Sequence, residues 1–231
     1  DCFVALPSAG LLAKTTRVNM IKKIIKLLFG VAILPVAVFA MINFCKEIAG
    51  VPAFTPAQMM FFYGVAVYVG IHIFIYKPDF LYVFGHESTH ALTAKIFGGK
   101  IFDFKVSSKG GSVKTDKANT TVALTPYMFP FYTILVSIAY AVLAIFKDVK
   151  PYTGQFVFIL GLTLAFHLVQ TAEFLRQKQS DITKSGYIFS MPLIIIINIA
   201  IISGILSFLF IDFSFKHMSM DTLEQVRELY V

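Results

Sequence analysis

Charged residues are scarce in this chain. Asp, Glu, Lys and Arg make up 14% of its 231 residues, whereas 57% are hydrophobic and the mean hydropathy is +0.77. Soluble domains carry about 25% charged residues, so the composition excludes an ordinary soluble protein. The apolar residues fall in separate blocks of roughly 20, long enough for a helix to cross a hydrocarbon core of about 30 Å. We therefore predict an all-α polytopic membrane protein that forms one compact helical bundle.

Cysteine is also rare, and this excludes two further classes of structure. Cys2 lies near the N-terminus and Cys45 at the end of the first apolar block, so neither a disulfide framework nor a cysteine metal knuckle is expected. The net charge of +7 does not indicate nucleic acid, because the basic residues flank apolar segments and form no soluble patch interleaved with aromatics. The expected partner is the lipid bilayer.

The chain lacks tandem repeats and soluble linkers, so we divide it by hydropathy alone. No methionine begins it, and residues 1–19 are interpreted as an N-terminal extension or an artificial remnant. Residues 20–213 are predicted to form a single membrane domain, and residues 214–231 a polar tail with a short surface helix. The apolar run after Met20 is too long for a signal peptide and lacks a clear cleavage site, so we expect a retained anchor.

About six apolar segments are long enough to be considered as membrane spans. Pro126 and Pro130 should kink the fourth of them near its start. Lys and Arg divide evenly between the two sides, but the basic group before the first segment favours a cytoplasmic N-terminus. We expect an integral, multi-pass protein of the cell membrane, and the sequence specifies no oligomeric state. The predicted segments are 27–45, 58–76, 80–97, 122–146, 156–175 and 187–211.

The third segment contains the motif His-Glu-Ser-Thr-His at residues 86–90. Residues four apart project from one face of a helix, so His86 and His90 can bind one metal ion while Glu87 contacts a water molecule there. Two imidazoles and a third ligand are a typical Zn²⁺ site of catalytic type, which keeps one position open. His and Glu are costly within an apolar helix and usually mark a functional cavity. The motif therefore predicts a zinc site with Glu87 as the catalytic general base.

The stretch GHESTHALTAKIFGGKIFDFKVSSKGGSVK resembles the core of the site-2 protease family of intramembrane zinc metallopeptidases. In that family a histidine-bearing helix is followed by small residues, a Gly-Gly stop and a β-hairpin. The resemblance covers about residues 80–113. It implies a zinc-dependent endopeptidase that acts on transmembrane or membrane-anchored protein substrates. It also implies a third metal ligand, an aspartate from a later core helix.

Asp181 is the best candidate for the third ligand, since it follows two intervening spans and precedes the last one. The family's usual Asn-Pro-Asp-Gly and Leu-Asp-Gly sequences are not present in this chain. Asp181 can also be interpreted as a helix N-cap before Ile182. His167 and Glu173 remain alternative ligands, because they recur at helical spacing in the fifth span, although hydrogen bonding between helices and interfacial placement would explain them too.

Residues 100–117 change from helical to alternating periodicity, with IFDFKV and SVK on either side of a Gly-containing turn. This pattern predicts a β-hairpin. Its strand edge cannot face lipid, so it must border a cavity, lie at the interface or be paired. We expect Ile101, Phe102, Phe104 and Val106 to bind an unwound substrate by strand addition, as the resemblance also implies. A simple interfacial connector is the alternative.

Three functions follow from these residues. The first is a zinc-dependent intramembrane endopeptidase that hydrolyses peptide bonds of membrane-anchored proteins. The second is a zincin acting at the membrane surface, with a glutamate such as Glu173 as third ligand. The third is a non-catalytic membrane protein whose zinc site is structural, and it predicts retained function after Glu87→Gln.

Overall fold

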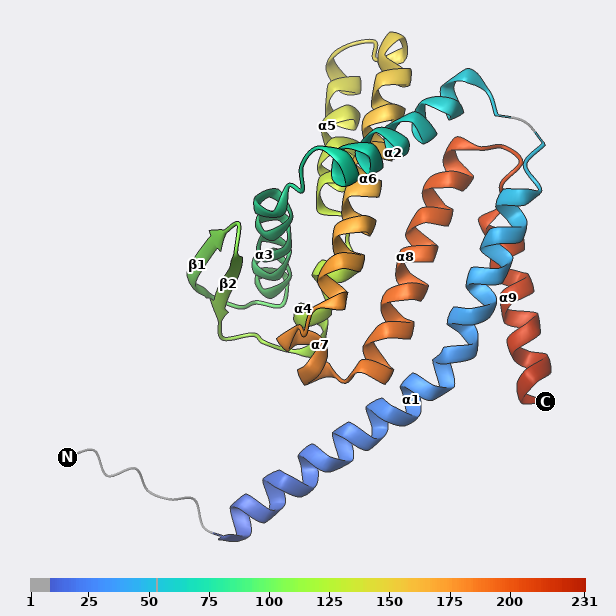
Figure 1. Cartoon of the computed structure of the whole chain (residues 1–231). Coiled ribbons are helices and arrows are strands. Elements are labelled where there is room, and N and C mark those ends of the chain that lie inside the picture. Colours follow the sequence, from blue (N-terminus) through green and yellow to red (C-terminus); the bar gives the residue numbers. More distant parts are fainter. Residues whose placement is uncertain (1–8, 53) are drawn as a thin grey trace.

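The computed structural model (Figure 1) describes residues 9–52 and 54–231, with side chains described from residue 20 onward. Cys2 and the first eight residues of the predicted extension lie outside this range. From Ala9 the backbone of the extension already belongs to the first helix, without a break at Met20. The helices are α1 (Ala9–Ala49), α2 (Pro56–Phe74), α3 (Asp79–Ile96), α4 (Thr120–Leu124), α5 (Phe131–Phe146), α6 (Thr153–Arg176), α7 (Ser180–Ser185), α8 (Tyr187–Leu209) and α9 (Phe215–Tyr230).

Two strands, β1 (Ile101–Ser107) and β2 (Gly110–Thr115), form the predicted hairpin. They pair antiparallel, with Phe104 opposite Val113. Two 3₁₀ turns complete the chain, η1 (Thr125–Tyr127) before α5 and η2 (Lys150–Tyr152) before α6. The fold is thus helical with one small sheet, as the hydropathy and periodicity indicated.

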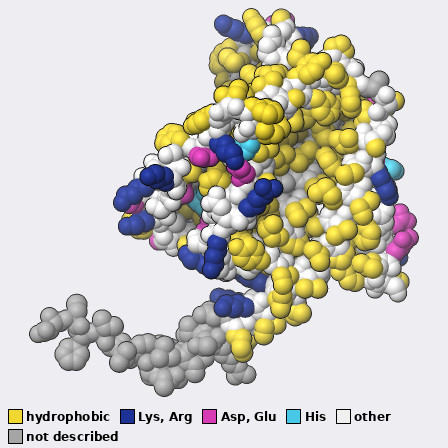
Figure 2. Space-filling view, viewed as in Figure 1, with side chains coloured by type: hydrophobic (Ala, Val, Ile, Leu, Met, Phe, Trp, Pro, Cys, Tyr) yellow, Lys and Arg dark blue, Asp and Glu magenta, His cyan; other side chains and the backbone are white. Residues whose placement is uncertain are grey.

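Among the described residues, four helices are long and apolar enough to cross a membrane, so the predicted total of about six spans is not confirmed. They comprise residues 20–49, 56–74, 150–176 and 187–209. Only 17–39% of the residues in their most apolar windows are buried inside the protein, and Figure 2 shows hydrophobic side chains covering much of the visible face. The third predicted segment, α3, is not among the four, because Asp79, Glu87 and Lys95 give it too much charge.

The fourth predicted segment is broken. Residues 120–127 and α5 together are apolar enough to span, but they meet at an angle of 76°. The break falls at residues 128–130, after the 3₁₀ turn that contains Pro126. Both prolines lack a backbone donor, and Pro130 also disfavours helical geometry in the residue before it. Counting this pair as one span raises the total to five. The prolines therefore separate α4 from α5 and leave α4 beside α3 and α7.

Close contacts at glycine residues help to pack the long helices together. α2 packs along α6, and α1 along α8 and α9. A Cβ atom on Gly161 of α6 would lie 2.1 Å from the carbonyl oxygen of Phe61, and one on Gly64 of α2 would lie 2.0 Å from that of Phe158. The two glycines let the backbones of α2 and α6 approach closely, as small residues do where membrane helices cross.

The predicted polar tail forms helix α9, as expected, and it is docked to the bundle. The side chain of Ser214 caps its first turn by accepting a hydrogen bond from His217 N. Met218 is buried in the main hydrophobic cluster, and Asn43 of α1 donates hydrogen bonds to Thr222 and Gln225. These contacts fix α9 against the C-terminal half of α1.

Candidate metal centre

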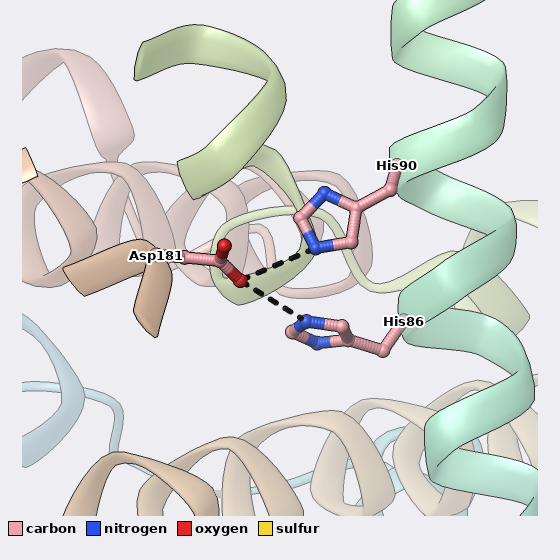
Figure 3. A group of neighbouring side chains, drawn as sticks. All are labelled: His86, His90 and Asp181. Carbon is pink, nitrogen blue, oxygen red and sulfur yellow. Dashed lines mark ion pairs between the residues drawn. The ribbon is translucent and has the colours of Figure 1, made fainter. Parts of the chain in front are cut away.

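Three side chains predicted as metal ligands converge between α3 and α7 (Figure 3). Oδ2 of Asp181 lies 3.4 Å from Nε2 of His90 and 3.9 Å from Nε2 of His86. One ligand atom from each residue lies within 4.8 Å of the other two. Within the described part of the chain, this is the one group of three or more His, Cys, Asp or Glu side chains that could hold a metal ion.

The local structure of α3 places the two histidines. Their rings lie on one face of the helix, one turn apart, with centroids 4.8 Å from each other. The helix ends at Ile96, and Gly98, two residues later, has a φ of +74°, the left-handed conformation that favours glycine after a helix. The Gly98-Gly99 stop therefore turns the chain into the hairpin immediately after the motif, as predicted.

The ring of His90 is oriented by α4. Its Nδ1 lies 2.8 Å from the carbonyl oxygen of Val122. A carbonyl can only accept, so Nδ1 carries a proton, and Nε2, which faces Asp181, is the nitrogen that would bind a metal ion. Metal-binding histidines commonly have such a carbonyl partner on the opposite nitrogen. Asn119, whose side chain caps α4 by accepting from Val122 N, fixes this turn in place.

The position of Asp181 is fixed by the next residue in the chain, Ile182, which is buried. Ile182 is 1% exposed and packs in a hydrophobic cluster with Leu124 and Tyr127, which anchors α7 against α4. The N-cap of α7 is Gln179, so Asp181 lies in the first turn and is not the cap residue considered above. Burial by itself would raise the pKa of Asp181, but hydrogen bonds from His86 and His90 outweigh it and hold that pKa well below its usual range. The carboxylate is therefore ionised at neutral pH.

These donors fit a tetrahedral zinc ion. In a tetrahedral site, zinc bonds of about 2.0–2.2 Å place the ligand atoms roughly 3.4 Å apart. The distance from Nε2 of His90 to Oδ2 of Asp181 is close to this value, and the distance from Nε2 of His86 to the same oxygen is slightly longer. Nδ1 of His86 is buried without a hydrogen-bond partner among the described residues. Its Nε2 faces the carboxylate, so two neutral imidazoles and one carboxylate can bind a divalent cation, and a fourth position remains for water or substrate.

A cleft of about 450 Å³ borders two of the three candidate ligands and Glu87. Its lining includes Glu87, His90 and Asp181, together with Gly111, Ser112, Val113 and Thr115 of β2 and part of α4 and α7. A Cβ atom on Gly111 would lie 2.5 Å from Cγ of Glu87, so only glycine lets β2 lie this close to α3. The predicted base thus lies where a bound chain along β2 would pass.

The four residues predicted to bind substrate lie on β1 and do not line this cleft. Phe104 packs on Phe84 of α3, with ring centroids 6.3 Å apart, and Phe102 is 67% exposed. A role for Ile101, Phe102, Phe104 and Val106 in substrate binding stays a prediction. The sequence pattern could not show which strand borders the cleft, because both strands have the same alternation. Only the packing of the hairpin on α3 decides this.

The alternative third ligands are held elsewhere. Glu173 forms ion pairs with Lys77 and His72, and it lines a different pocket. Nε2 of His167 lies 3.2 Å from Oδ1 of Asn198. Because Nδ2 of Asn198 donates to the carbonyl oxygens of Tyr127 and Ile194, its Oδ1 faces His167 and accepts from that ring.

Asn198 was missed by the sequence reasoning, although a single amide side chain within the apolar α8 was a signal for it. Its three hydrogen bonds join α6, η1 and α8. Gly111 was also missed. Its role follows from its close approach to Glu87. A Gly-Gly pair after a turn does not indicate, in the sequence, that one of the two glycines will lie against a residue on another element.

Comparison of the chain with protein families, curated proteins and solved structures finds no match. The site is therefore interpreted from its own geometry and chemistry.

Proposed function

We propose that this chain is a zinc-dependent intramembrane endopeptidase that hydrolyses peptide bonds of membrane-anchored protein substrates. One observation carries the proposal: His86 and His90 converge with Asp181, which lies 91 or more residues further along the chain, and Glu87, His90 and Asp181 line an open cleft. A purely structural metal site has no need of a free carboxylate at a cleft. The resemblance to site-2 proteases supports the same function.

Each residue has a role that its position supports. His86, His90 and Asp181 would hold zinc, which when bound supplies a Lewis acid that activates water and polarises a carbonyl group. Glu87 takes a proton from the attacking water and delivers it to the leaving amine. The carbonyl of Val122 keeps the proton of His90 on Nδ1, away from the zinc.

The substrate would lie along β2. In a two-stranded sheet each strand keeps one edge without a backbone partner, and the lining of the cleft includes Gly111, Ser112 and Val113. An extended segment can add to such an edge through backbone hydrogen bonds. A transmembrane substrate must first unwind, because a helix has already paired its backbone groups.

Membrane embedding is supported by the four long apolar helices and by their exposed hydrophobic surface. Hydrolysis needs water beside these apolar helices. The cleft supplies a polar route, since Ser112, Thr115, Asn119, Thr120 and Ser180 belong to its lining. The active site would therefore be open to water from the side of the hairpin and α7.

The membrane-surface zincin is less well supported, because Glu173 pairs with Lys77 and His72 and is not in the group of three. The non-catalytic alternative does not explain why Glu87 lies at the cleft. Both alternatives make predictions that differ from those of the proposed function, and one set of variants distinguishes all three.

The test is to measure the zinc content of the purified chain and its cleavage of a panel of membrane-anchored reporter proteins. Glu87→Gln should keep the zinc and lose at least about a hundredfold in cleavage rate, as expected for removal of a general base. Asp181→Ala should weaken zinc binding, and Glu173→Gln is the matched control that should retain zinc. Unchanged cleavage by Glu87→Gln would refute the catalytic proposal, and loss of zinc from Glu173→Gln would favour the surface zincin.

A further inference from the structure

A second groove, next to the catalytic cleft, lies where α1 passes the junction of α7 and α8. It has a volume of about 870 Å³ and is lined on one side by α1 and on the other by residues 183–189. Four lysines belong to this lining: Lys22, Lys23, Lys26 and Lys184. We call it the basic groove.

The positive charge of the basic groove is uncompensated. Among the described residues that line it, none is acidic, and none of its four lysines takes part in the ion pairs found in the described part of the chain. Lys26 is held in place, because its Nζ donates to Oγ1 of Thr120 at 2.7 Å and lies 5.6 Å from the ring centroid of Phe189. Both partners are neutral. An anion bound here would relieve the repulsion between these lysines.

The rest of the groove is apolar. Ile25, Leu27 and Ile188 line it and are 59%, 45% and 53% exposed, respectively. The lysines and these side chains lie together where two apolar helices begin, since the apolar part of α1 starts after Lys26 and α8 starts at Tyr187. Figure 2 shows basic side chains beside hydrophobic ones where α1 leaves the body of the protein.

A tight helix crossing lies beside the basic groove. A Cβ atom on Gly30 would lie 2.4 Å from the carbonyl oxygen of Ile188, so α1 and α8 are in backbone contact one turn beyond Lys26. A ligand therefore cannot pass between the two helices there. It must place its charged part among the lysines and its apolar part along the outer surface of the helices.

We propose that the basic groove binds the headgroup of an anionic phospholipid, with the phosphate among the four lysines and the acyl chains along Ile25, Leu27 and Ile188. Lysines at the ends of membrane helices bind acidic lipids in this way. The proposal rests on the membrane embedding proposed above, but it requires neither zinc nor catalysis. Thr120, Lys184 and Ser185 line both the basic groove and the catalytic cleft. The lipid would therefore lie against α4 and against α7, the helix that carries Asp181.

Native mass spectrometry of the full chain in detergent tests this proposal. Dioleoyl phosphatidylglycerol, dioleoyl phosphatidylcholine and inorganic phosphate are added in separate titrations. Phosphatidylglycerol should bind with one preferred site, at least tenfold more tightly than phosphatidylcholine, and inorganic phosphate alone should not bind detectably. Replacing all four lysines of the basic groove with Gln should weaken phosphatidylglycerol binding at least tenfold, and replacing them with Arg should preserve it.

The matched control replaces Lys109, Lys117, Lys147 and Lys150 with Gln, which removes the same charge outside the basic groove. This control should bind phosphatidylglycerol like the wild type. An equal loss in both Gln variants would overturn the site, and so would equal binding of phosphatidylcholine or binding of phosphate alone. Glu87→Gln should bind the lipid normally, so failure of the catalytic proposal and failure of the lipid site give different results.

Discussion

A Cβ atom on Gly111 would lie 2.5 Å from Cγ of Glu87. The same atom would lie 2.8 Å from the carbonyl oxygen of Lys105 and 2.9 Å from Cγ1 of Val83. It would thus meet the predicted base, the partner strand and the helix that carries the motif. The absence of a side chain at Gly111 lets β2 lie against α3 beside Glu87.

Gly111→Ala should therefore separate β2 from α3 or displace Glu87. We expect zinc content to stay near that of the wild type, because no ligand is touched, while the cleavage rate falls at least about tenfold. Cleavage of a membrane-anchored reporter and zinc content are measured on the same preparation. The control is Gly70→Ala in α2, where an added Cβ meets nothing within 4 Å. Wild-type cleavage by Gly111→Ala would show that the close contact is not needed for activity.

The crossing of α2 and α6 should be equally sensitive. Gly161→Ala places a methyl group against the carbonyl oxygen of Phe61, and such overpacking typically destabilises a protein by about 1–3 kcal/mol. Thermal unfolding in detergent should show a lower midpoint than the wild type. Gly204→Ala in α8, which meets nothing within 4 Å, should not lower it. A Gly161→Ala midpoint as high as that of the control would contradict the close crossing.

His167 should not be a metal ligand, because its Nε2 donates to Asn198. His167→Gln keeps a polar side chain at this position, so we expect zinc content to stay at the wild-type level. His90→Gln, which removes one of the three converging ligands, is the positive control and should lose zinc. Zinc measured by atomic emission after gel filtration decides the matter, and loss of the metal from His167→Gln would restore that residue as a ligand.

The docking of α9 should weaken as pH rises. A hydrogen bond from His217 to Glu47, together with the charge of Asp221, raises the pKa of His217 above its ordinary value of 6.5. A raised folded-state pKa means that the protonated ring stabilises the folded protein fully below about pH 6.5 and that this contribution is lost as pH rises through the higher value. Stability thus decreases on the alkaline side.

The measurement is the difference in thermal midpoint between the wild type and His217→Gln, taken from pH 5.5 to 9. The difference should be largest at the acid end and shrink toward zero at the alkaline end. Glu224→Gln, an exposed substitution on the same helix, controls for general effects of charge on α9. A difference that is constant with pH would rule out a contribution from protonated His217.

Local regularity explains which parts of the site could be predicted. His86, Glu87 and His90 are related by the helical repeat, and the hairpin follows from two alternating runs around glycines, so both are encoded within short stretches. The four long apolar helices are also encoded within short stretches. Two of them, residues 56–74 and 187–209, begin and end within about two residues of the predicted spans. Asp181 was predicted from the order of elements and the resemblance, and its position beside the histidines agrees with that prediction.

The amino-acid sequence by itself determined the apolar helices, the motif on α3 and the turn into the hairpin, because propensity, hydropathy and helical spacing act over a few residues. Only the tertiary structure decided that Ile182 anchors Asp181 beside His90, that β2 and not β1 lines the cleft, and that lysines of α1 and α7 share one groove. These features depend on packing between segments far apart in the chain, and the side chains that decide them carry no local signal of their partners.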